Sequence, residues 1–156
     1  MAMHDGMGNT FYCVIRNTDS KDRFPDNTQT SFRVKLDPPV TLLGKWGCGL
    51  TEITYNKQTF SSANGVASLY ICSSMCDASH VGDKRLPLLR QVPIVRDGES
   101  DWVTERFHPV YTVPVKQGIL DNIDVTILDE CGKPIVAEHD QSTITLTIEF
   151  LPLPEK

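Results

Sequence analysis

The chain has 156 residues, of which 40% are hydrophobic and 22% are charged, and it carries a net charge of −5. A single domain of this length buries enough surface to fold without a disulfide or a metal, and no apolar run approaches the ~18 residues that a membrane helix needs. The negative charge disfavours a dedicated nucleic-acid binder, because contacts to phosphate need clustered Lys and Arg.

The pattern along the chain is one of short strands. Residues 1–10 lack the apolar core of a secretory signal and are expected to form a flexible arm. Short stretches rich in Val, Ile, Thr, Tyr and Phe then alternate with clusters of Gly, Pro, Asn and Asp, without a sustained helical stripe. The predicted strands are Thr10–Arg16, Ser31–Leu36, Trp46–Tyr55, Ala67–Ser74, Leu89–Val95, Thr104–Val115, Asp121–Leu128 and Ser142–Leu151. Eight antiparallel strands predict an all-β, single jelly-roll sandwich over residues 11–151, with a tail at 152–156.

Alternation within these strands predicts which side chains face the core. The last strand places four apolar residues on one face, with threonines and Glu149 on the other: Ile144, Leu146, Ile148 and Phe150. Ile123, Val125 and Ile127 follow the same pattern. Pro38, Pro39 and Pro109 interrupt strand patterns and mark ends or edges, because proline cannot donate to a strand ladder.

Two long connections, residues 17–30 and 75–88, are expected to carry contacts. The segment around the second one holds three positive charges, Lys84, Arg85 and Arg90. Its plainer interpretation is a Gly-Asp turn followed by a strand. Because residues 101–156 sum to −6, we hypothesise that this basic loop meets an acidic sheet of the next copy in a head-to-tail ring.

The two tryptophans are predicted to differ. Trp46 follows a Gly-containing turn and leads a strand, which favours a place in the core. Trp102 lies beside Glu99 and Asp101, which favours exposure. We therefore expect Trp102 to be the contact residue; stacking on a sugar is the alternative role for an exposed tryptophan.

The odd number of cysteines does not suit a secreted disulfide framework. These are Cys13, Cys48, Cys72, Cys76 and Cys131. We expect free thiols and assembly in a reducing compartment, with Cys48 and Cys72 buried as small hydrophobes.

Metal sites find little support in the sequence. Cys72, Cys76 and His80 lie four residues apart, a spacing that could hold zinc on a helix but not on a strand that runs into a loop. The four histidines are isolated, which disfavours a cupin metal site. The acidic residues of the last third are expected to be solvated rather than calcium ligands: Asp121, Asp124, Asp129 and Glu130.

A catalytic site is equally weakly indicated. Cys131 could pair with His139 or His108 as a nucleophile, because a fold can bring such partners together, but nothing nearby in the sequence supports the pair. We therefore expect no enzyme activity, no metal and no cofactor.

Several motifs in a fixed order carry a family resemblance from Phe24 to Phe150. The alternating run from Phe32 to Leu36 and a proline-rich turn precede G-K-W-x-x-x-L-x-E-I-x-Y at 44–55. V-G-D-x-x-x-P-L-L-R-x-V-P-I then follows at 81–94, and F-H-P-V-Y-T-V-P-V at 107–115. This order resembles the single jelly-roll penton proteins of adintoviruses and Maverick/Polinton elements.

The resemblance implies a non-catalytic structural role. Five copies would form each vertex of an icosahedral virion and contact a double jelly-roll major capsid protein, with no direct nucleic acid contact. A trimeric receptor ligand or a carbohydrate-binding jelly roll is the alternative. Either would normally be secreted, whereas this chain lacks a paired cysteine set.

Overall fold

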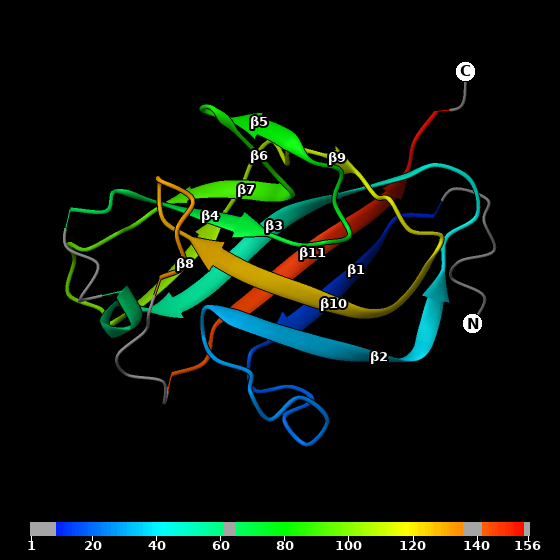
Figure 1. Ribbon diagram of the computed structural model, residues 1–156. Coiled ribbons are helices and arrows are strands. Elements are labelled where there is room, and N and C mark those ends of the chain that lie inside the picture. Colours follow the sequence, from blue (N-terminus) through cyan, green and yellow to red (C-terminus); the bar gives the residue numbers. More distant parts are fainter. Residues whose placement is uncertain (1–8, 61–64, 136–141, 155–156) are drawn as a thin grey trace.

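A computed structural model describes residues 9–60, 65–135 and 142–154 of the chain. Two antiparallel sheets face each other across one core, and a short hairpin projects from their side (Figure 1). The arm predicted for residues 1–10 and the end of the predicted tail lie largely outside the described residues. Within the described part, no helix is both long and apolar enough to cross a membrane.

The first sheet has the strand order β1-β11-β3-β8. Its strands are β1 (Phe11–Arg16), β11 (Thr145–Pro152), β3 (Trp46–Asn56) and β8 (Trp102–Arg106). A fifth short strand, β9 (Val113–Pro114), pairs with the start of β3 through Gly47 and Cys48. A single-turn 3-10 helix, η1 (Lys57–Phe60), follows β3 directly.

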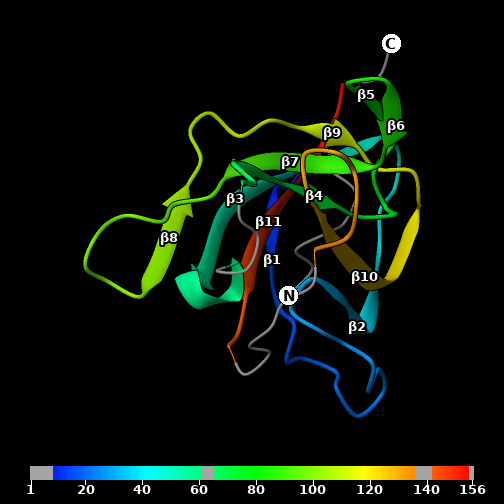
Figure 2. The same cartoon turned by 60° about the vertical axis from the view of Figure 1, so that its left-hand side comes forward.

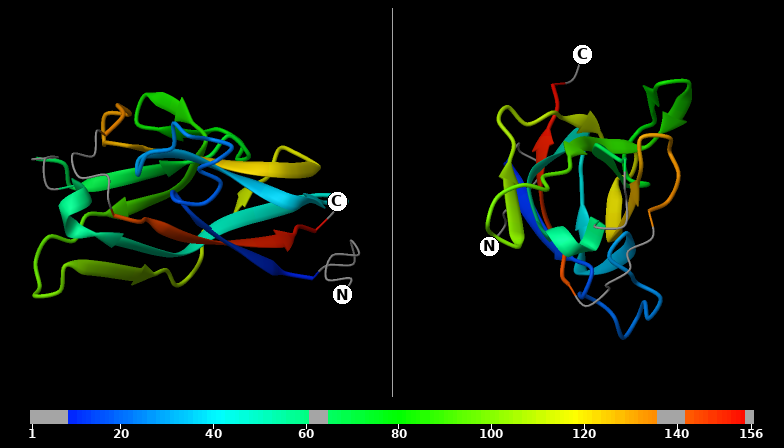
Figure 3. Two further views of the ribbon diagram at one scale, coloured as in Figure 1. Left: turned by 90° about the horizontal axis from the view of Figure 1, so that it is seen from below. Right: turned by 90° about the vertical axis from the view of Figure 1, so that its left-hand side faces the viewer.

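The second sheet has the order β2-β10-β4-β7. Its strands are β2 (Ser31–Thr41), β10 (Ile119–Leu128), β4 (Ser68–Cys72) and β7 (Leu88–Pro93). The separate hairpin is made of β5 (Ser79–Val81) and β6 (Lys84–Leu86). Because the chain returns repeatedly from one sheet to the other, the long strands interleave as in a jelly roll (Figure 3).

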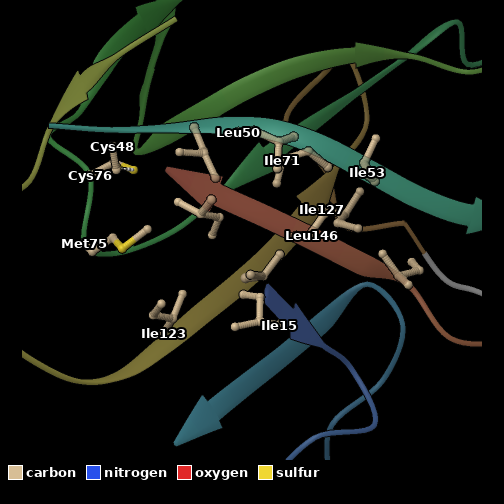
Figure 4. Packing of buried hydrophobic residues seen from close by; sticks show 14 of the residues in the cluster. Ile15, Cys48, Leu50, Ile53, Ile71, Met75, Cys76, Ile123, Ile127 and Leu146 are labelled. Carbon is tan, nitrogen blue, oxygen red and sulfur yellow. Dashed lines mark hydrogen bonds between the residues drawn. The ribbon is translucent and has the colours of Figure 1, made fainter. Parts of the chain in front are cut away.

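The predicted alternation is confirmed where it was clearest. In β11, the side chains of Leu146, Ile148 and Phe150 are fully buried, while Thr145, Thr147 and Glu149 are partly exposed. Ile123 and Ile127 of β10 close the core from the other sheet, facing Leu50 and Ile53 of β3 (Figure 4). Burial of one face in each sheet thus fixes the register of the strands.

An aromatic cluster fills one end of the core. The ring of Phe11 stacks on Phe150, with centroids 5.0 Å apart, and lies 5.6 Å from the ring of Trp46. Trp46 is only 3% exposed, and its Nε1 donates a hydrogen bond to the carbonyl oxygen of Leu43. The prediction that Trp46 belongs to the core is confirmed.

Some predicted strand bounds are corrected. The structure has eleven strands in its described part rather than eight, since β5, β6 and β9 are short additions. The strand predicted over Thr104–Val115 is interrupted between β8 and β9. There the chain crosses β3 at Gly47 and Gly49, where a Cβ atom would collide with Thr112 and Val110 respectively. Only glycine leaves room for that crossing.

Strand β2 is longer than predicted, because it continues through Pro38 and Pro39 to Thr41. It pairs only with β10, so one side of β2 needs no donor from the chain. The ladder shifts register between Leu120 and Asn122 of β10. The prolines therefore mark an edge strand, as predicted, but not the end of that strand.

Candidate subunit interface

The hairpin formed by β5 and β6 is a projecting basic element. Gly82, with a φ of +61°, makes its turn, and Val81 and His80 pair with Lys84 and Arg85. The chain just before the hairpin is fastened to the sandwich by two backbone hydrogen bonds. Asp77 N donates to the Pro114 carbonyl at 3.1 Å, and Lys116 N donates to the Met75 carbonyl at 2.8 Å.

Lys84 and Arg85 are both exposed on β6. The Lys84 Nζ donates a hydrogen bond of 2.8 Å to the carbonyl oxygen of Cys131. The Arg85 side chain has no hydrogen bond or ion pair with any residue that the structure describes. The hairpin is therefore tied to the turn after β10 through Lys84, while the charge of Arg85 faces outward.

A hollow of about 360 Å³ separates the hairpin from that turn. Its lining includes the apolar or aromatic residues Tyr70, Val81 and Leu86 and the lysines Lys84 and Lys133. The carboxylate residues Asp83 and Glu130 line it as well. The hollow is thus an amphipathic depression whose lining carries two charges of each sign.

Two carboxylates near the hollow are occupied by the protein itself. Glu130 accepts hydrogen bonds from the backbone N–H groups of Ala67 and Ser68. Asp129 Oδ1 accepts from the N–H groups of Cys131 and Lys133, each at 2.9 Å. These bonds hold the turn, whereas the charged side chains of Asp83 and Lys133 make no hydrogen bond or ion pair with the described residues.

Arg90 lies in a different environment from Lys84 and Arg85. It pairs with the buried Ile71 across β7 and β4, so its side chain leaves β7 on the core side of the sheet. Its guanidinium lies 4.0 Å from the ring centroid of Phe107 and 4.3 Å from that of Tyr111. The Nε and Nη1 atoms are buried and have no hydrogen-bond partner in the described part of the chain. Arg90 thereby joins β7 to the connection between β8 and β9.

Trp102 begins β8 and is 49% exposed, which confirms the prediction that it is a surface residue. It follows the segment 97–101, which Lys57 holds in place. The Lys57 Nζ donates to the carbonyl oxygens of Asp97 and Gly98, and the Lys57 N–H donates to that of Asp101 at 2.8 Å. The backbone of this segment is fixed by these bonds.

The side chains of the same segment are not held in this way. No hydrogen bond or ion pair joins the carboxylates of Asp97, Glu99 and Asp101 to the described residues. The sequence reasoning noted acidic neighbours of Trp102 but missed this segment as a surface of its own. Three carboxylates in five residues directly before an aromatic residue were the signal that could have found it.

The four residues predicted to contact a neighbouring subunit therefore occupy three places. Lys84 and Arg85 share the hairpin, and Trp102 begins β8, an edge strand of the first sheet. Arg90 lies where β7 of the second sheet meets the connection between β8 and β9, a region that we call the seam. Figures 2 and 3 show the hairpin and the segment before β8 on opposite sides of the sandwich. Their role in subunit contacts stays a prediction.

The residues weighed as a zinc site are dispersed. Cys72 and Cys76 are buried, whereas His80 is exposed on the hairpin. Among the described residues, no three His, Cys, Asp or Glu side chains converge as metal ligands. Instead, the sulfurs of Cys76 and Cys48 lie 3.8 Å apart, and the hydrogen bond between them, together with burial, raises the pKa of the Cys76 thiol.

The acidic residues weighed as a calcium site also serve separate purposes. Asp121 lies 3.9 Å from the Nζ of Lys35. Asp124 accepts hydrogen bonds from the N–H and hydroxyl of Ser74, whereas Asp129 and Glu130 hold the turn described above. The expectation that these carboxylates do not form one cluster agrees with their geometry.

The residues weighed as a nucleophilic pair can be placed only in part. Cys131 is exposed on the turn after β10, and His108 lies in the connection between β8 and β9. His139 lies outside the described residues. The geometry adds no support to a catalytic pair.

Comparison with known proteins gives one informative result. No family model matches the sequence, and no curated protein matches it. Among solved structures, the chain is similar to the mavirus penton protein, with a TM-score of 0.61 and 7% sequence identity. The match covers 91% of this chain and 99% of the mavirus chain. The protein therefore has the single jelly-roll fold of a virus penton protein, in agreement with the fold that its sequence motifs implied.

Proposed function

We propose that the protein is a structural capsid protein that forms the vertices of an icosahedral virion. The observation that carries this proposal is the fold shared with the mavirus penton protein across almost the full length of both chains. The motif order of the sequence points to the same class independently. Its action would be interfacial and without turnover: rigid sheets give the subunit its shape, while loops and strand edges make the contacts.

The vertex requires five copies in a ring. We propose a homopentamer in which Lys84, Arg85 and Trp102 contribute contacts between copies, with Arg90 as the fourth candidate. One feature supports a head-to-tail arrangement, in which different surfaces meet. The basic hairpin and β8, which begins with Trp102, lie on opposite sides of the subunit (Figures 2 and 3), and a ring closes when each copy presents one surface to the next.

Further partners belong to the same proposal. The ring would contact the double jelly-roll major capsid protein that surrounds a vertex, without contacting nucleic acid directly. The terminal segments 1–10 and 152–156 are proposed to contact neighbouring subunits in the particle. Assembly inside the host cell, where thiols stay reduced, suits the five cysteines.

The test is the mass of the purified protein, measured by light scattering over a concentration series. Five copies of the 17.4 kDa chain make 87 kDa, and a species of that mass is the expected result. A species of 52.2 kDa, three copies, would support the trimeric ligand or lectin class instead. A chain that stays at 17.4 kDa, even with the major capsid protein added, would contradict the proposal.

The contribution of the basic hairpin is tested by reversing its charge. Lys84→Glu together with Arg85→Glu is expected to shift the ring toward monomers at equal concentration. Lys21→Glu, on the long connection between β1 and β2, is the matched control and should leave the mass unchanged. A double variant that still forms the 87 kDa species in full would remove the hairpin from the interface.

A further inference from the structure

Two surface features of the subunit suit each other in shape. One is the hollow beside the hairpin, whose lining combines apolar groups with two lysines and two carboxylates. The other is the half-exposed Trp102, which follows an acidic segment. One is a depression and the other an exposed aromatic side chain, and the exposed Arg85 on the hairpin has the sign opposite to the carboxylates before Trp102.

Other charged groups are less suited to a partner because they are used within the subunit. Glu52 is bound by Arg106 at 2.7 Å, and Glu149 accepts a hydrogen bond from Tyr12. The carboxylates of Asp121, Asp124, Asp129 and Glu130 have the partners given above. The carboxylates of Asp97, Glu99 and Asp101 have none among the described residues and lie within five positions of each other. This makes the segment 97–101 the densest set of carboxylates left for another molecule in the described part.

Resting on the proposed penton function, we propose that Trp102 of one copy inserts into the hollow beside the hairpin of the next copy. The indole would pack against the wall that Tyr70, Val81 and Leu86 form, and the acidic residues before it would face Lys84, Lys133 and Arg85. The occupant of the hollow is therefore a second copy of this chain.

The size and chemistry of the hollow suit this occupant. At about 360 Å³, its volume exceeds the roughly 300 Å³ at which small-molecule sites begin. An aromatic side chain that fills a pocket, surrounded by a polar rim, is the usual form of an energetic centre in an interface. Exposed ion pairs contribute only about 0.2–1 kcal/mol each and mainly set orientation and association rate. The indole accordingly supplies the energy, and the charges select the partner surface.

The placement of the two surfaces explains why the assembly would be a ring. Because the hairpin and the segment before β8 lie on opposite sides of the sandwich, one copy cannot satisfy both with the same neighbour (Figures 2 and 3). Each copy would donate its Trp102 to one neighbour and accept that of the other. Such a heterologous contact closes when the rotation between copies divides the circle.

The first experiment removes each half of the contact separately. Trp102→Ala removes the inserted group, and Val81→Glu places a carboxylate in the hollow against the incoming acidic segment. Each variant is expected to weaken association at least about thirtyfold, as for a central interface residue. Tyr12→Ala and Val14→Glu are matched controls on β1, where both side chains are more than half exposed. Both controls should keep the 87 kDa species, and unchanged melting temperatures would show that all four variants fold.

Mixing the two variants tests the direction of the contact. The Val81→Glu copy still carries Trp102, and the Trp102→Ala copy still has an open hollow. An equimolar mixture should therefore form pairs of 34.8 kDa and stop there, whereas each variant alone stays at 17.4 kDa. A mixture that remains monomeric while the unaltered chain forms rings would overturn the inference and leave the proposed function standing. An unaltered chain that never assembles would overturn both.

Fluorescence gives a readout that mass does not. The chain has two tryptophans, and Trp46 is buried at 3% exposure, so quenching by acrylamide reports mainly on Trp102 in the monomer. Assembly is expected to protect that emission from the quencher. Trp102→Phe should still form rings, but quenching by acrylamide should no longer change on assembly, because only the buried Trp46 then emits. Rings in which Trp102 stays fully accessible would contradict its insertion.

Discussion

Two arginines that lie five positions apart in the sequence, Arg85 on β6 and Arg90 on β7, have opposite surroundings. Arg90, on β7, is stacked between Phe107 and Tyr111 and holds the second sheet to the connection that crosses the first. Arg85, on β6, is exposed, and its side chain has no hydrogen bond or ion pair with the described residues. The charge of Arg90 therefore interacts with aromatic rings within the subunit, whereas the charge of Arg85 on the hairpin is accessible to another molecule.

The difference between Arg90 and Arg85 indicates that this jelly roll uses separate regions for the stability of the subunit and for its assembly. The seam is tight, because Gly47 and Gly49 of β3 lie against Thr112 and Val110. In addition, Lys116 N donates to the Met75 carbonyl and Asp77 N to the Pro114 carbonyl, which ties the connection after β4 to the segment around β9. The hairpin contributes little to the core, since its residues are exposed or half-buried. Substitutions at the seam should change the free energy of unfolding, and those at the hairpin should change only the oligomer.

The largest effect is expected at Gly49. A Cβ atom there would collide with Val110 and approach the Tyr111 carbonyl oxygen to 2.7 Å. Gly49→Ala should therefore lower the free energy of unfolding by about 2–3 kcal/mol, as overpacking does. Gly118→Ala, whose Cβ would meet nothing nearer than 3.7 Å, is the control and should change the free energy of unfolding by less than about 1 kcal/mol. Urea denaturation measures both; equal stability of the two variants would mean that the crossing of β3 is loose.

Alkaline pH should loosen the anchor that precedes the hairpin. Burial raises the pKa of Cys72 to about 11, and that of Cys76 is raised by its hydrogen bond to Cys48 and by burial, from an ordinary value of 9.0. The unfolded chain then loses these protons first, so stability present below pH 9 falls as the pH rises toward the folded values. Each thiol contributes at most about 1.4 kcal/mol per pH unit.

The measurement is the urea midpoint at pH 8, 9, 10 and 10.5. Cys72→Ser should flatten the loss of stability above pH 9, whereas Cys131→Ser, at an exposed position, should leave it unchanged. A loss of stability that is identical in all three proteins would attribute the effect to groups other than Cys72.

At the seam itself, Arg90→Ala is expected to lower the free energy of unfolding by about 2 kcal/mol, because it removes two cation–ring contacts and the packing of the stem. Arg90→Met keeps the stem and should recover about half of that loss. If the methionine variant is at least as stable as the original protein, the charge of Arg90 contributes nothing net, and its buried nitrogens without partners have offset the ring contacts.

The smallest effect on stability is expected at Arg85. Arg85→Ala should stay within about 0.5 kcal/mol of the original protein, as surface substitutions usually do. The same variant should lower the fraction of 87 kDa species at low salt, and the difference should shrink as salt screens the rim charges. A loss of stability comparable to that of Arg90→Ala would erase the distinction between hairpin and seam.

Much of the fold could be predicted from the sequence because apolar and polar residues alternate along strands that are buried on one face. Ile148 and Phe150 alternate with Thr147 and Glu149, and the structure places them as that pattern indicates. Turns and chain crossings are less evident from the local sequence pattern. The interruption between β8 and β9 depends on glycines in β3, which is more than fifty residues away in sequence, so no local pattern reveals it.

The candidate interface was predictable only in part, for a similar reason. Exposure of Trp102 followed from its acidic neighbours, and Lys84 and Arg85 were expected on a long connection with a turn at Gly82 and Asp83, but the β5–β6 hairpin that carries them was not predicted. The environment of Arg90 did not, because Phe107 and Tyr111 reach it through the tertiary fold. The hollow could not be predicted from the sequence either, because Val81 and Lys133 belong to separate elements that only the fold brings together.

The pairing of β1 with β11 has a consequence for any ring that the protein forms. Phe11 lies opposite Phe150, so the first and last strands begin and end at the same pole of the sandwich. Trp102 pairs with Asn56 at the far end of β3, which is about 33 Å long at 3.3 Å per residue. Cyclic symmetry repeats each point of a subunit at one height along the rotation axis. A tag fused next to β1 or β11 would therefore appear as a single tier in an image of the ring, separated along the strand direction from the contact at Trp102.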